Sequence, residues 1–372
     1  MDFVFFDAGG GHRAAATALA RVIAEQRRPL EVRMVNLQEL LDSIDIFRKA
    51  TGLRLQDLYN LMLKKGWTLG SAQMMAGMHL AIRLLHGRAV RLLQKLWLEN
   101  RPDLVVSLVP NFNRALCESV RLAFPGVPFL TILTDLADYP PHFWIERRQR
   151  QYFICGTDKA VEQALALGHD RANVFRVSGM ILNPAFYEMT GLSAEQRAAE
   201  RARLGFQADR PVGLVLFGGQ GATVMYDIAR RLPDRQLLLI CGHNQKLAAK
   251  LRALRRDAPI FVEGFTKEVA RYMQLVDYFI GKPGPGSISE AVAMRLPVIV
   301  VRNAWTLPQE RYNADWVRDQ GVGIVLPNFS GIAAAVDQLL EPSAYARFRA
   351  ATERQENRAV FEIPEILEQL LR

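Results

Sequence analysis

Short apolar runs alternate with longer amphipathic segments from one end of this chain to the other. Apolar runs of about 4–8 residues are typical of buried strands, and apolar positions spaced three or four apart are typical of helices. The pattern predicts one set of strands at Phe3–Asp7, Glu31–Asn36, Leu104–Leu108, Phe129–Thr134, Gln151–Cys155 and Val174–Val177, and a second set at Val212–Phe217, Gln236–Ile240, Ile260–Val262, Asp277–Ile280, Val298–Val301 and Gly323–Leu326. Strands that alternate with helices form mostly parallel sheets covered on both faces. We therefore expect an α/β protein with two Rossmann-like domains that face a cleft.

The boundary between the predicted domains falls in a hinge at Gly179–Pro184, so that residues 1–180 form the first domain and residues 181–372 the second. A charged, alanine-rich helix is expected at Glu188–Gly205, directly after the hinge. We expect the last helix of the chain to pack back on the first domain.

A glycine turn follows a strand and precedes a helix at three places, Asp7–His12, Leu214–Gly221 and Lys282–Ser287. Such a turn makes an anion site, because unpaired N–H groups and the helix dipole point at one place. Gly284 and Gly286 admit a phosphate close to the backbone. The alternative is topological, because Gly-Pro turns before helices occur throughout α/β proteins.

Polar side chains that suit a sugar accompany the third turn. We expect a helix at Ile288–Met294 whose first turn carries Glu290, a carboxylate that can accept hydrogen bonds from hydroxyl groups. Gln309, Glu310 and Asn313 follow the next buried strand at the same carboxyl edge, where open parallel sheets bind ligands. Together these residues predict a site for a nucleotide diphosphate attached to a sugar.

His12 stands at the start of the helix that follows the first glycine turn. At the carboxyl end of a strand it faces the predicted cleft, where a neutral imidazole can take a proton from a hydroxyl group at pH 7. The alternative is that His12 only caps or packs the turn. A dinucleotide site is disfavoured, because Ala14 takes the third glycine position of the G-x-G-x-x-G pattern and the second strand ends in Asn36 rather than an acid.

The composition suits soluble domains with sizeable cores, since half of the 372 residues are apolar and the mean hydropathy is near zero. No apolar run reaches the roughly 18 residues that span a bilayer, and the first strand begins without a signal peptide. We therefore expect a cytoplasmic or peripheral protein. Cys117, Cys155 and Cys241 lack C-x-x-C spacing, so neither disulfides nor structural zinc is expected.

Most of the net charge of +9 lies in a helical insertion at about 48–101, which holds ten basic and two acidic residues. Basic residues interleaved with Trp, Leu and Met at helical spacing are typical of a helix at an anionic membrane surface. The membrane-binding candidates are Trp67, Arg83, Arg88, Arg91, Lys95 and Trp97. A helical hairpin of the core with a solvated basic face explains the same pattern. Nucleic acid is disfavoured, because neither an RNA-binding aromatic motif nor a recognition helix is present.

With these motifs assembled, the chain resembles the monogalactosyldiacylglycerol synthases and related diacylglycerol glucosyltransferases, and more distantly the peptidoglycan lipid-intermediate N-acetylglucosaminyltransferase. The resemblance runs nearly end to end. It is carried by D-A-G-G-G-H-R-A-A-A (7–16), P-D-L-V-V-S-L-V-P (102–110), T-D-L (134–136), F-G-G-Q-G (217–221), I-C-G-H-N-Q-K-L (240–247), G-F-T-K-E-V (264–269), G-K-P-G-P-G-S-I-S-E-A (281–291), L-P-V-I (296–299) and P-Q-E-R-Y-N (308–313). Such proteins have the two-domain GT-B fold, need no metal or other cofactor, and transfer a hexose from a UDP-sugar to diacylglycerol with inversion.

The resemblance implies a role for each matched position. His12 would be the general base toward the acceptor hydroxyl, and Glu310 would be a second catalytic residue beside the sugar. The donor-binding residues would be Gly218, Gly219, Phe265, Thr266, Gly284, Gly286, Ser287, Ile288, Ser289, Glu290, Gln309 and Asn183. The acceptor-binding residues would be Gly10, Gly11, Pro110, Asn111 and Asp135. The insertion corresponds to the segment thought to grip the membrane in that family, which implies a peripheral protein on the inner face of the cell membrane.

Two departures from the family pattern stand out. The hinge lacks the family's Pro-Val-Arg-Pro-like run and reads G-M-I-L-N-P at Gly179–Pro184, so an arginine that could meet the donor phosphate is missing. The segment after Thr134 keeps Asp135, His142 and Trp144 with altered spacing, so the acceptor can differ.

The sequence leaves several alternatives open. The transferred sugar can be galactose, glucose or glucuronate, and the oligomeric state is not determined. A polyprenyl or sterol acceptor would keep the donor residues and change only the first domain. A non-catalytic sugar-nucleotide or lipid-binding protein would keep the fold, but the presence of both His12 and Glu310 disfavours it.

Overall fold

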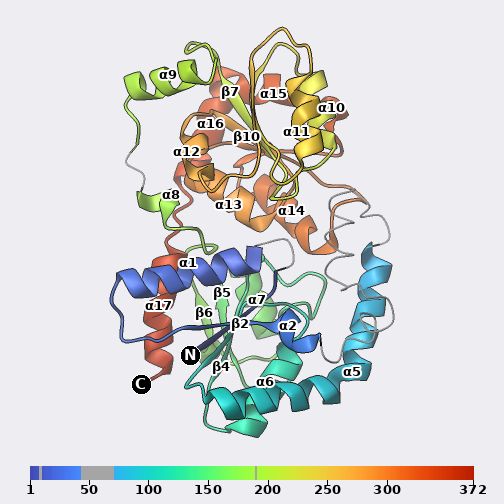
Figure 1. Cartoon of the computed structure of the whole chain (residues 1–372), viewed down its shortest axis with the longest axis vertical. Helices are drawn as coiled ribbons and strands as arrows, with labels where there is room; N and C mark the ends of the chain where they lie inside the picture. The colour runs from blue at the N-terminus through green and yellow to red at the C-terminus, as the bar shows by residue number, and fades with distance from the viewer. Residues whose placement is uncertain (8–10, 43–70, 189–190) are drawn as a thin grey trace.

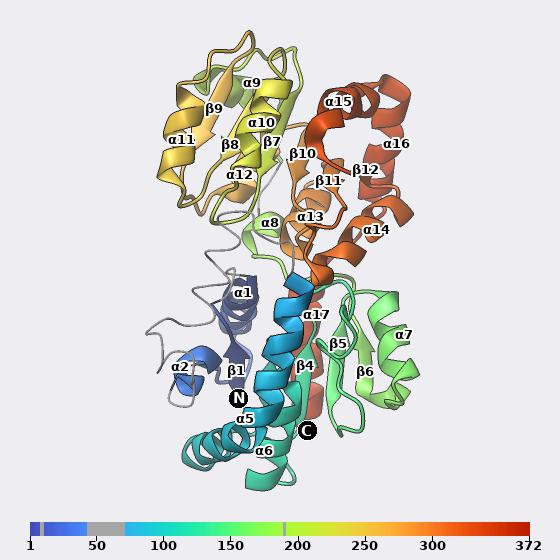
Figure 2. The same cartoon turned by 90° about the vertical axis from the view of Figure 1, so that its right-hand side faces the viewer.

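The computed structural model describes residues 1–7, 11–42, 71–188 and 191–372. The chain forms two domains stacked end to end, each built around a sheet of six parallel strands with helices on both faces (Figures 1 and 2). The predicted two-domain α/β fold is therefore confirmed. No helix of these described segments is long and apolar enough to cross a membrane.

The N-terminal sheet has the strand order β2-β1-β3-β4-β5-β6. Its strands are β1 (Asp2–Phe5), β2 (Arg33–Asn36), β3 (Val105–Ser107), β4 (Phe129–Ile132), β5 (Tyr152–Cys155) and β6 (Val174–Arg176). The accompanying helices are α1 (Gly11–Glu25), α2 (Leu37–Leu41), α5 (Ser71–Asn100), α6 (Asn113–Ala123), α7 (Asp158–Ala166) and the short η1 (Arg171–Asn173). All six strands predicted for this half are present.

The C-terminal sheet has the strand order β12-β11-β10-β7-β8-β9. Its strands are β7 (Val212–Leu216), β8 (Gln236–Ile240), β9 (Ile260–Glu263), β10 (Tyr278–Gly281), β11 (Val298–Val301) and β12 (Gly323–Leu326). The helices are α8 (Ala185–Glu188), α9 (Ala194–Arg203), α10 (Val224–Arg231), α11 (Gln245–Arg252), α12 (Val269–Gln274), α13 (Pro285–Ala293), η2 (Pro308–Glu310), α14 (Arg311–Asp319), η3 (Phe329–Gly331), α15 (Ile332–Leu340), α16 (Pro342–Glu353) and α17 (Ala359–Leu370). The six strands predicted for this half are likewise present.

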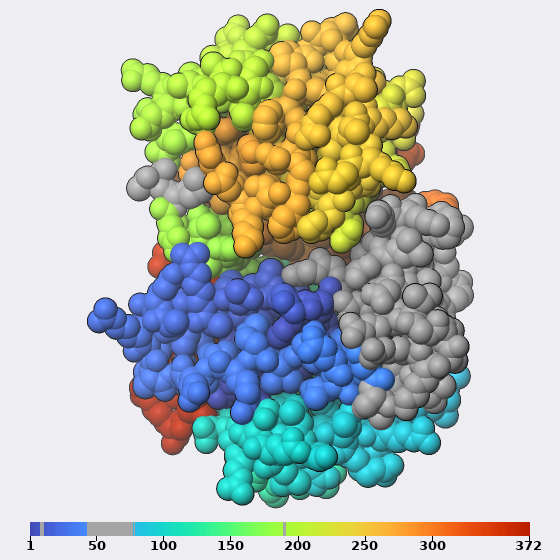
Figure 3. Space-filling view, viewed as in Figure 1, coloured from blue at the N-terminus to red at the C-terminus, as the bar shows by residue number. Residues whose placement is uncertain are grey.

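The last helix, α17, leaves the C-terminal domain and packs beside α1 on the N-terminal sheet (Figure 1). Ala359, Val360, Ile363 and Leu367 belong to the same apolar cluster as the buried face of α1. The chain therefore crosses between the domains twice. The space-filling view shows the furrow that remains between the two domains (Figure 3).

Helix α5 runs along the outside of the N-terminal domain and packs against α6. Its buried face carries Ala89, Val90, Leu93 and Trp97, which join an apolar cluster with the inner face of α6. Trp97 is fully buried, and its indole donates a hydrogen bond to Ser119 Oγ at 2.8 Å. The predicted membrane role of Trp97 is therefore wrong, because its ring is part of the domain core.

Two predicted helix boundaries are also wrong, because local capping decides them. The helix expected at Glu188–Gly205 begins only at Ala194, where Ser193 and Gln196 form a reciprocal capping box. The helix expected from Ile288 begins instead at Pro285, with Gly284 as its N-cap. Proline suits the first helical position, because its φ angle is already helical and its missing N–H would have no partner there.

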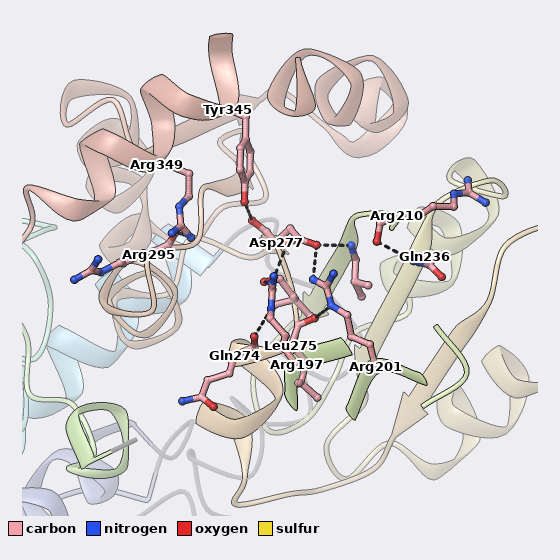
Figure 4. Close-up of polar contacts among 12 residues, drawn as sticks. Arg197, Arg201, Arg210, Gln236, Gln274, Leu275, Asp277, Arg295, Tyr345 and Arg349 are labelled. Atoms are coloured by element: carbon pink, nitrogen blue, oxygen red, sulfur yellow. Dashed lines mark hydrogen bonds and ion pairs between the residues drawn. The ribbon is translucent and has the colours of Figure 1, made fainter. Parts of the chain in front are cut away.

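Asp277, directly before β10, joins α9 to the amino end of the C-terminal sheet (Figure 4). Its carboxylate accepts hydrogen bonds from Arg197 at 2.9 Å, from Arg201 at 2.6 Å and from the Val212 backbone N–H at 2.8 Å. Arg201 is buried, which lowers the pKa of its guanidinium against the opposing effect of Asp277. Asp277 thus compensates a buried charge and lies far from the carboxyl strand ends that carry the predicted site.

Candidate active site

The predicted general base, His12, lies in the first turn of α1. Its Nδ1 is 3.0 Å from Thr134 Oγ1, and its ring lies 5.9 Å from the Trp144 ring between centroids. Burial of the ring lowers the pKa of His12 to about 4, and the backbone carbonyl of Leu108 partly opposes this effect. The imidazole is therefore neutral at pH 7 and has a lone pair available for a proton.

Asp135 follows β4 and is buried beside His12's partner Thr134. Its Oδ2 accepts a hydrogen bond from the Trp144 indole at 2.9 Å. Burial raises the pKa of Asp135 to about 7; the Trp144 bond and Lys282 oppose the rise, whereas Glu310 adds to it. Since Lys282 and Glu310 belong to the C-terminal domain, the predicted acceptor and donor sides come within electrostatic reach of each other.

The remaining described acceptor candidates lie at the same edge of the N-terminal sheet. Asn111 has a φ of 67°, its N–H donates to the Phe143 carbonyl at 2.6 Å, and its Oδ1 lies 2.7 Å from His79 Nε2. This contact brings the first part of α5 over the strand ends. Pro110 is buried and Gly11 opens α1, whereas Gly10, like the membrane candidate Trp67, lies outside the described residues.

The altered segment after Thr134 folds around Asp138. Its carboxylate accepts hydrogen bonds from the backbone N–H groups of Trp144 at 2.6 Å and His142 at 3.0 Å. Tyr139 of the same segment stacks on Tyr312 of α14, with ring centroids 5.7 Å apart. The segment thus forms a contact between the two domains directly beside the predicted sugar-binding residues.

On the predicted donor side, Gly284, Gly286 and Ser287 lie at the N-terminus of α13. A Cβ atom on Gly286 would meet nothing within 4 Å, so this backbone is open to an approaching group. Asn313 is fully buried and stabilises the turn, because its Nδ2 donates a hydrogen bond to the Pro283 carbonyl at 2.9 Å. The amino end of α13 therefore has the geometry expected of an anion site.

Ile288 does not fit its implied role as a diphosphate contact. Its side chain is fully buried in the apolar cluster of the C-terminal domain, and its N–H donates to the Gly284 carbonyl at 3.1 Å. Because the helix begins at Pro285, neither the side chain nor the N–H group of Ile288 is available to a diphosphate. Ser289 instead lines a cavity, together with the hinge residue Gly179 and with Tyr312.

A second glycine turn, Gly218–Gly221, lies beside the α13 turn. Gly218 and Gly221 have positive φ angles, which glycine adopts without strain. A Cβ on Gly218 would lie 3.8 Å from Lys282 Cε. A Cβ on Gly219 would meet nothing within 4 Å, so this turn is also open toward a ligand.

Lys282 connects these elements, although nothing in the local sequence pattern indicated a role for it. Its Nζ lies 2.6 Å from Glu310 Oε1. Glu310 is buried at the end of η2, next to Gln309. Glu310, which is predicted to contact sugar hydroxyls, therefore already forms an ion pair with Lys282, the residue directly after β10.

The predicted base-binding pair, Phe265 and Thr266, lies after β9. The Phe265 side chain is half exposed, and its ring stacks on His243 with centroids 4.2 Å apart and planes 16° apart. Thr266 Oγ1 accepts a hydrogen bond from the Glu268 N–H at 3.0 Å. An exposed aromatic face at a carboxyl strand edge is suited to stacking against a nucleobase.

Two further donor candidates have distinct surroundings. The side chain of Glu290, on α13, is partly exposed to solvent. Burial of its carboxyl group nevertheless raises the pKa of Glu290 to about 7. Asn183, in the hinge, uses Oδ1 to accept a hydrogen bond from the Ala185 N–H at the start of α8. Among the residues that the structure describes, no group of three or more His, Cys, Asp or Glu side chains could hold a metal ion.

Residues 214–370 match the model of the glycosyltransferase family 28 C-terminal domain. The whole fold is similar to the solved structure of MurG from Acinetobacter baumannii, with a TM-score of 0.60, 14% identity and 99% of each chain covered. It is also similar to Os79 from O. sativa, with a TM-score of 0.62, 13% identity and both chains fully covered. The chain is a glycosyltransferase with the GT-B fold, and its C-terminal domain is similar to that of family 28.

Relatives that match most of this chain carry a more specific name. The spinach (Spinacia oleracea) monogalactosyldiacylglycerol synthase is 27% identical over 391 residues, which cover 98% of this chain and 71% of the relative. The probable monogalactosyldiacylglycerol synthase 2 of Oryza sativa subsp. indica is 29% identical, with 86% and 68% covered. The similarity thus includes the N-terminal domain as well as the C-terminal domain.

Proposed function

We propose that this glycosyltransferase moves a hexose from a UDP-sugar to diacylglycerol at a membrane surface, with inversion at the anomeric carbon. The names of its relatives favour UDP-galactose as the first donor to test. The observation that carries the proposal is that candidate catalytic and binding residues of both domains come together at the domain boundary. His12 and Asp135 come from one domain, and the α13 turn with Lys282 and Glu310 comes from the other.

In this proposal the acceptor hydroxyl gives its proton to neutral His12 as its oxygen forms a bond to the anomeric carbon. The bond between that carbon and the diphosphate oxygen breaks, and UDP leaves with the electron pair. The N–H groups of Gly286 and Ser287 and the dipole of α13 stabilise the charge that develops on the leaving group. We infer that this backbone site acts in place of a metal ion.

The exposed face of α5 supports the membrane part of the proposal. Leu80 and Leu84 are 58% and 77% exposed, one turn apart, and Arg83, Arg88 and Arg91 are exposed on the same helix. Leucine side chains can enter the acyl boundary while arginines contact anionic headgroups. We propose peripheral binding to the inner face of the cell membrane through this surface.

The experiment that tests the function is a transfer assay with purified protein. A panel of UDP-sugars is offered with diacylglycerol in mixed micelles, with and without anionic lipid, and the products are separated by thin-layer chromatography. We expect a glycolipid from UDP-galactose, also in the presence of EDTA. A product that requires a divalent metal would contradict the metal-free mechanism. No diacylglycerol product from any donor, together with measurable UDP binding, would contradict the acceptor, and polyprenyl and sterol acceptors would be tested next.

A further inference from the structure

Lys282 occupies a central place between the two glycine turns of the donor side. Its Cε lies 3.4 Å from the position of a Cβ atom on Gly284 and 3.8 Å from that of a Cβ atom on Gly218. The side chain is one-third exposed and is held by Glu310, whose own side chain is only 10% exposed. The ammonium group thus stands where a diphosphate bound to these turns would be.

The charges around Lys282 are unbalanced. Glu310 contacts the ammonium group directly, and Asp135 of the other domain interacts with it electrostatically, so that one cation is shared between two carboxyl groups. Burial is the main cause of the raised pKa of Asp135; Glu310 adds to the rise, and Lys282 opposes it. A diphosphate carries more negative charge than a single carboxylate, and its oxygens are strong acceptors of charge-assisted hydrogen bonds.

A cation for the donor diphosphate is also missing elsewhere. The hinge sequence at Gly179–Pro184 contains no arginine or lysine. In the described parts of the chain, the two glycine turns and the N-terminus of α13 supply N–H groups but no full positive charge apart from Lys282. The ammonium group of Lys282 is therefore placed to supply that charge.

We propose that Lys282 binds the donor's diphosphate and stabilises UDP as it leaves, and that Glu310 holds the ammonium group in place until the donor arrives. The inference rests on the proposed UDP-sugar donor. When the bond between the anomeric carbon and the diphosphate oxygen breaks, the electron pair stays on UDP. Lys282 remains protonated and takes no part in proton transfer. Lys282→Arg keeps the charge and preserves most of the binding.

The test compares UDP with uridine, which lacks the phosphates, as probes of the purified protein in titration calorimetry. Lys282→Met weakens UDP binding about 10-fold or more, since a charge-assisted contact is lost, and leaves uridine binding unchanged. Lys250→Met is the matched control. Lys250, on α11 of the same domain, lies over the ring of Tyr226 on α10. If the wild-type protein does not bind UDP, the proposed donor fails, which is a different result from failure of Lys282.

Glu310→Gln separates a diphosphate-binding lysine from a merely structural ion pair. If Lys282 binds diphosphate, removing its competing carboxylate leaves UDP binding as tight as in the wild type or tighter. A structural pair would weaken UDP binding equally in Glu310→Gln and Lys282→Met. That equal loss, or UDP binding by a folded Lys282→Met variant within about twofold of the wild type, would overturn the proposal. Circular dichroism establishes that each variant is folded.

Discussion

The hydroxyl group of Thr134 lies 3.0 Å from Nδ1 of His12, although 122 positions separate the two residues. The contact exists because β1 and β4 end at the same edge of one parallel sheet, with β3 between them. It fixes the imidazole ring in one orientation. Such a contact orients a general base in the way that triad partners orient a catalytic histidine.

We expect His12→Ala to abolish hexose transfer and to leave UDP binding nearly intact, because in the proposed mechanism the imidazole removes the acceptor proton and the other domain binds the donor. Transfer rates measured beside UDP affinities by calorimetry check this. Thr134→Val removes only the orienting contact, so kcat falls by about 10-fold while the donor KM is unchanged. A His12→Ala variant that keeps more than about a twentieth of the activity would exclude His12 as the base.

The buried carboxyl of Glu290 predicts an unusual dependence of stability on pH. Its pKa is raised by burial from 4.5 to about 7 in the folded protein. Between these values the folded state holds the proton more tightly than the unfolded state, so stability falls as pH rises from about 4.5 to about 7 and is then constant.

Glu290→Gln removes this titration and keeps the shape of the side chain. We expect the variant to gain about 1–3 kcal/mol in unfolding free energy over the wild type at pH 8, and little at pH 4.5. Urea unfolding of both proteins at the two pH values measures the difference. An equal gain at both pH values would show that folding does not raise the pKa of Glu290.

Asp277 compensates the buried guanidinium of Arg201, and its removal is expected to destabilise the C-terminal domain. Asp277→Ala leaves Arg201 buried without its carboxylate and costs about 3–5 kcal/mol of unfolding free energy. Asp337→Ala serves as the control, because Asp337 pairs with Arg235 on the surface, where an ion pair contributes about 0–1 kcal/mol. Thermal melting of both variants is the measurement, and similar small shifts would contradict the buried-pair interpretation.

The exposed face of α5 is expected to bind anionic vesicles. Replacing Arg83, Arg88 and Arg91 together by Gln weakens binding to vesicles of acidic phospholipid in a salt-dependent way, because each arginine contributes about 1 kcal/mol near such a surface. Leu80→Ser with Leu84→Ser weakens binding independently of salt, since these side chains enter the acyl boundary. Vesicle sedimentation at low and high salt measures both effects.

The matched control removes the same charge from the other domain. Arg230, Arg231 and Arg255 are exposed near the ends of α10 and α11, and their replacement by Gln leaves vesicle binding unchanged if the α5 surface is responsible. Equal losses in the two triple variants would indicate a response to net charge alone. Unchanged binding of the α5 variant at low salt would leave its arginines a structural role.

Local sequence determined the strands of this protein, because buried parallel strands such as Tyr278–Gly281 appear as short, nearly continuous apolar runs. It also indicated the glycine turns, since an open backbone beside a strand end requires particular residues there. It did not determine where α13 begins. That boundary depends on the capping geometry of Gly284 and Pro285, which the helical periodicity of the following residues does not reveal.

Only the tertiary structure decided which side chains meet. The periodicity of α5 could not show that Trp97 faces α6 and Leu84 faces outward, because an amphipathic helix with basic and apolar positions fits either a core or a membrane. Likewise, Lys282 and Glu310 are 28 positions apart, and Asp135 comes from another domain. The sequence determined which chemical groups the chain carries and at which strand ends they lie, whereas the packing of sheets and domains decided their distances and their pKa values, because both depend on neighbours that are remote along the chain.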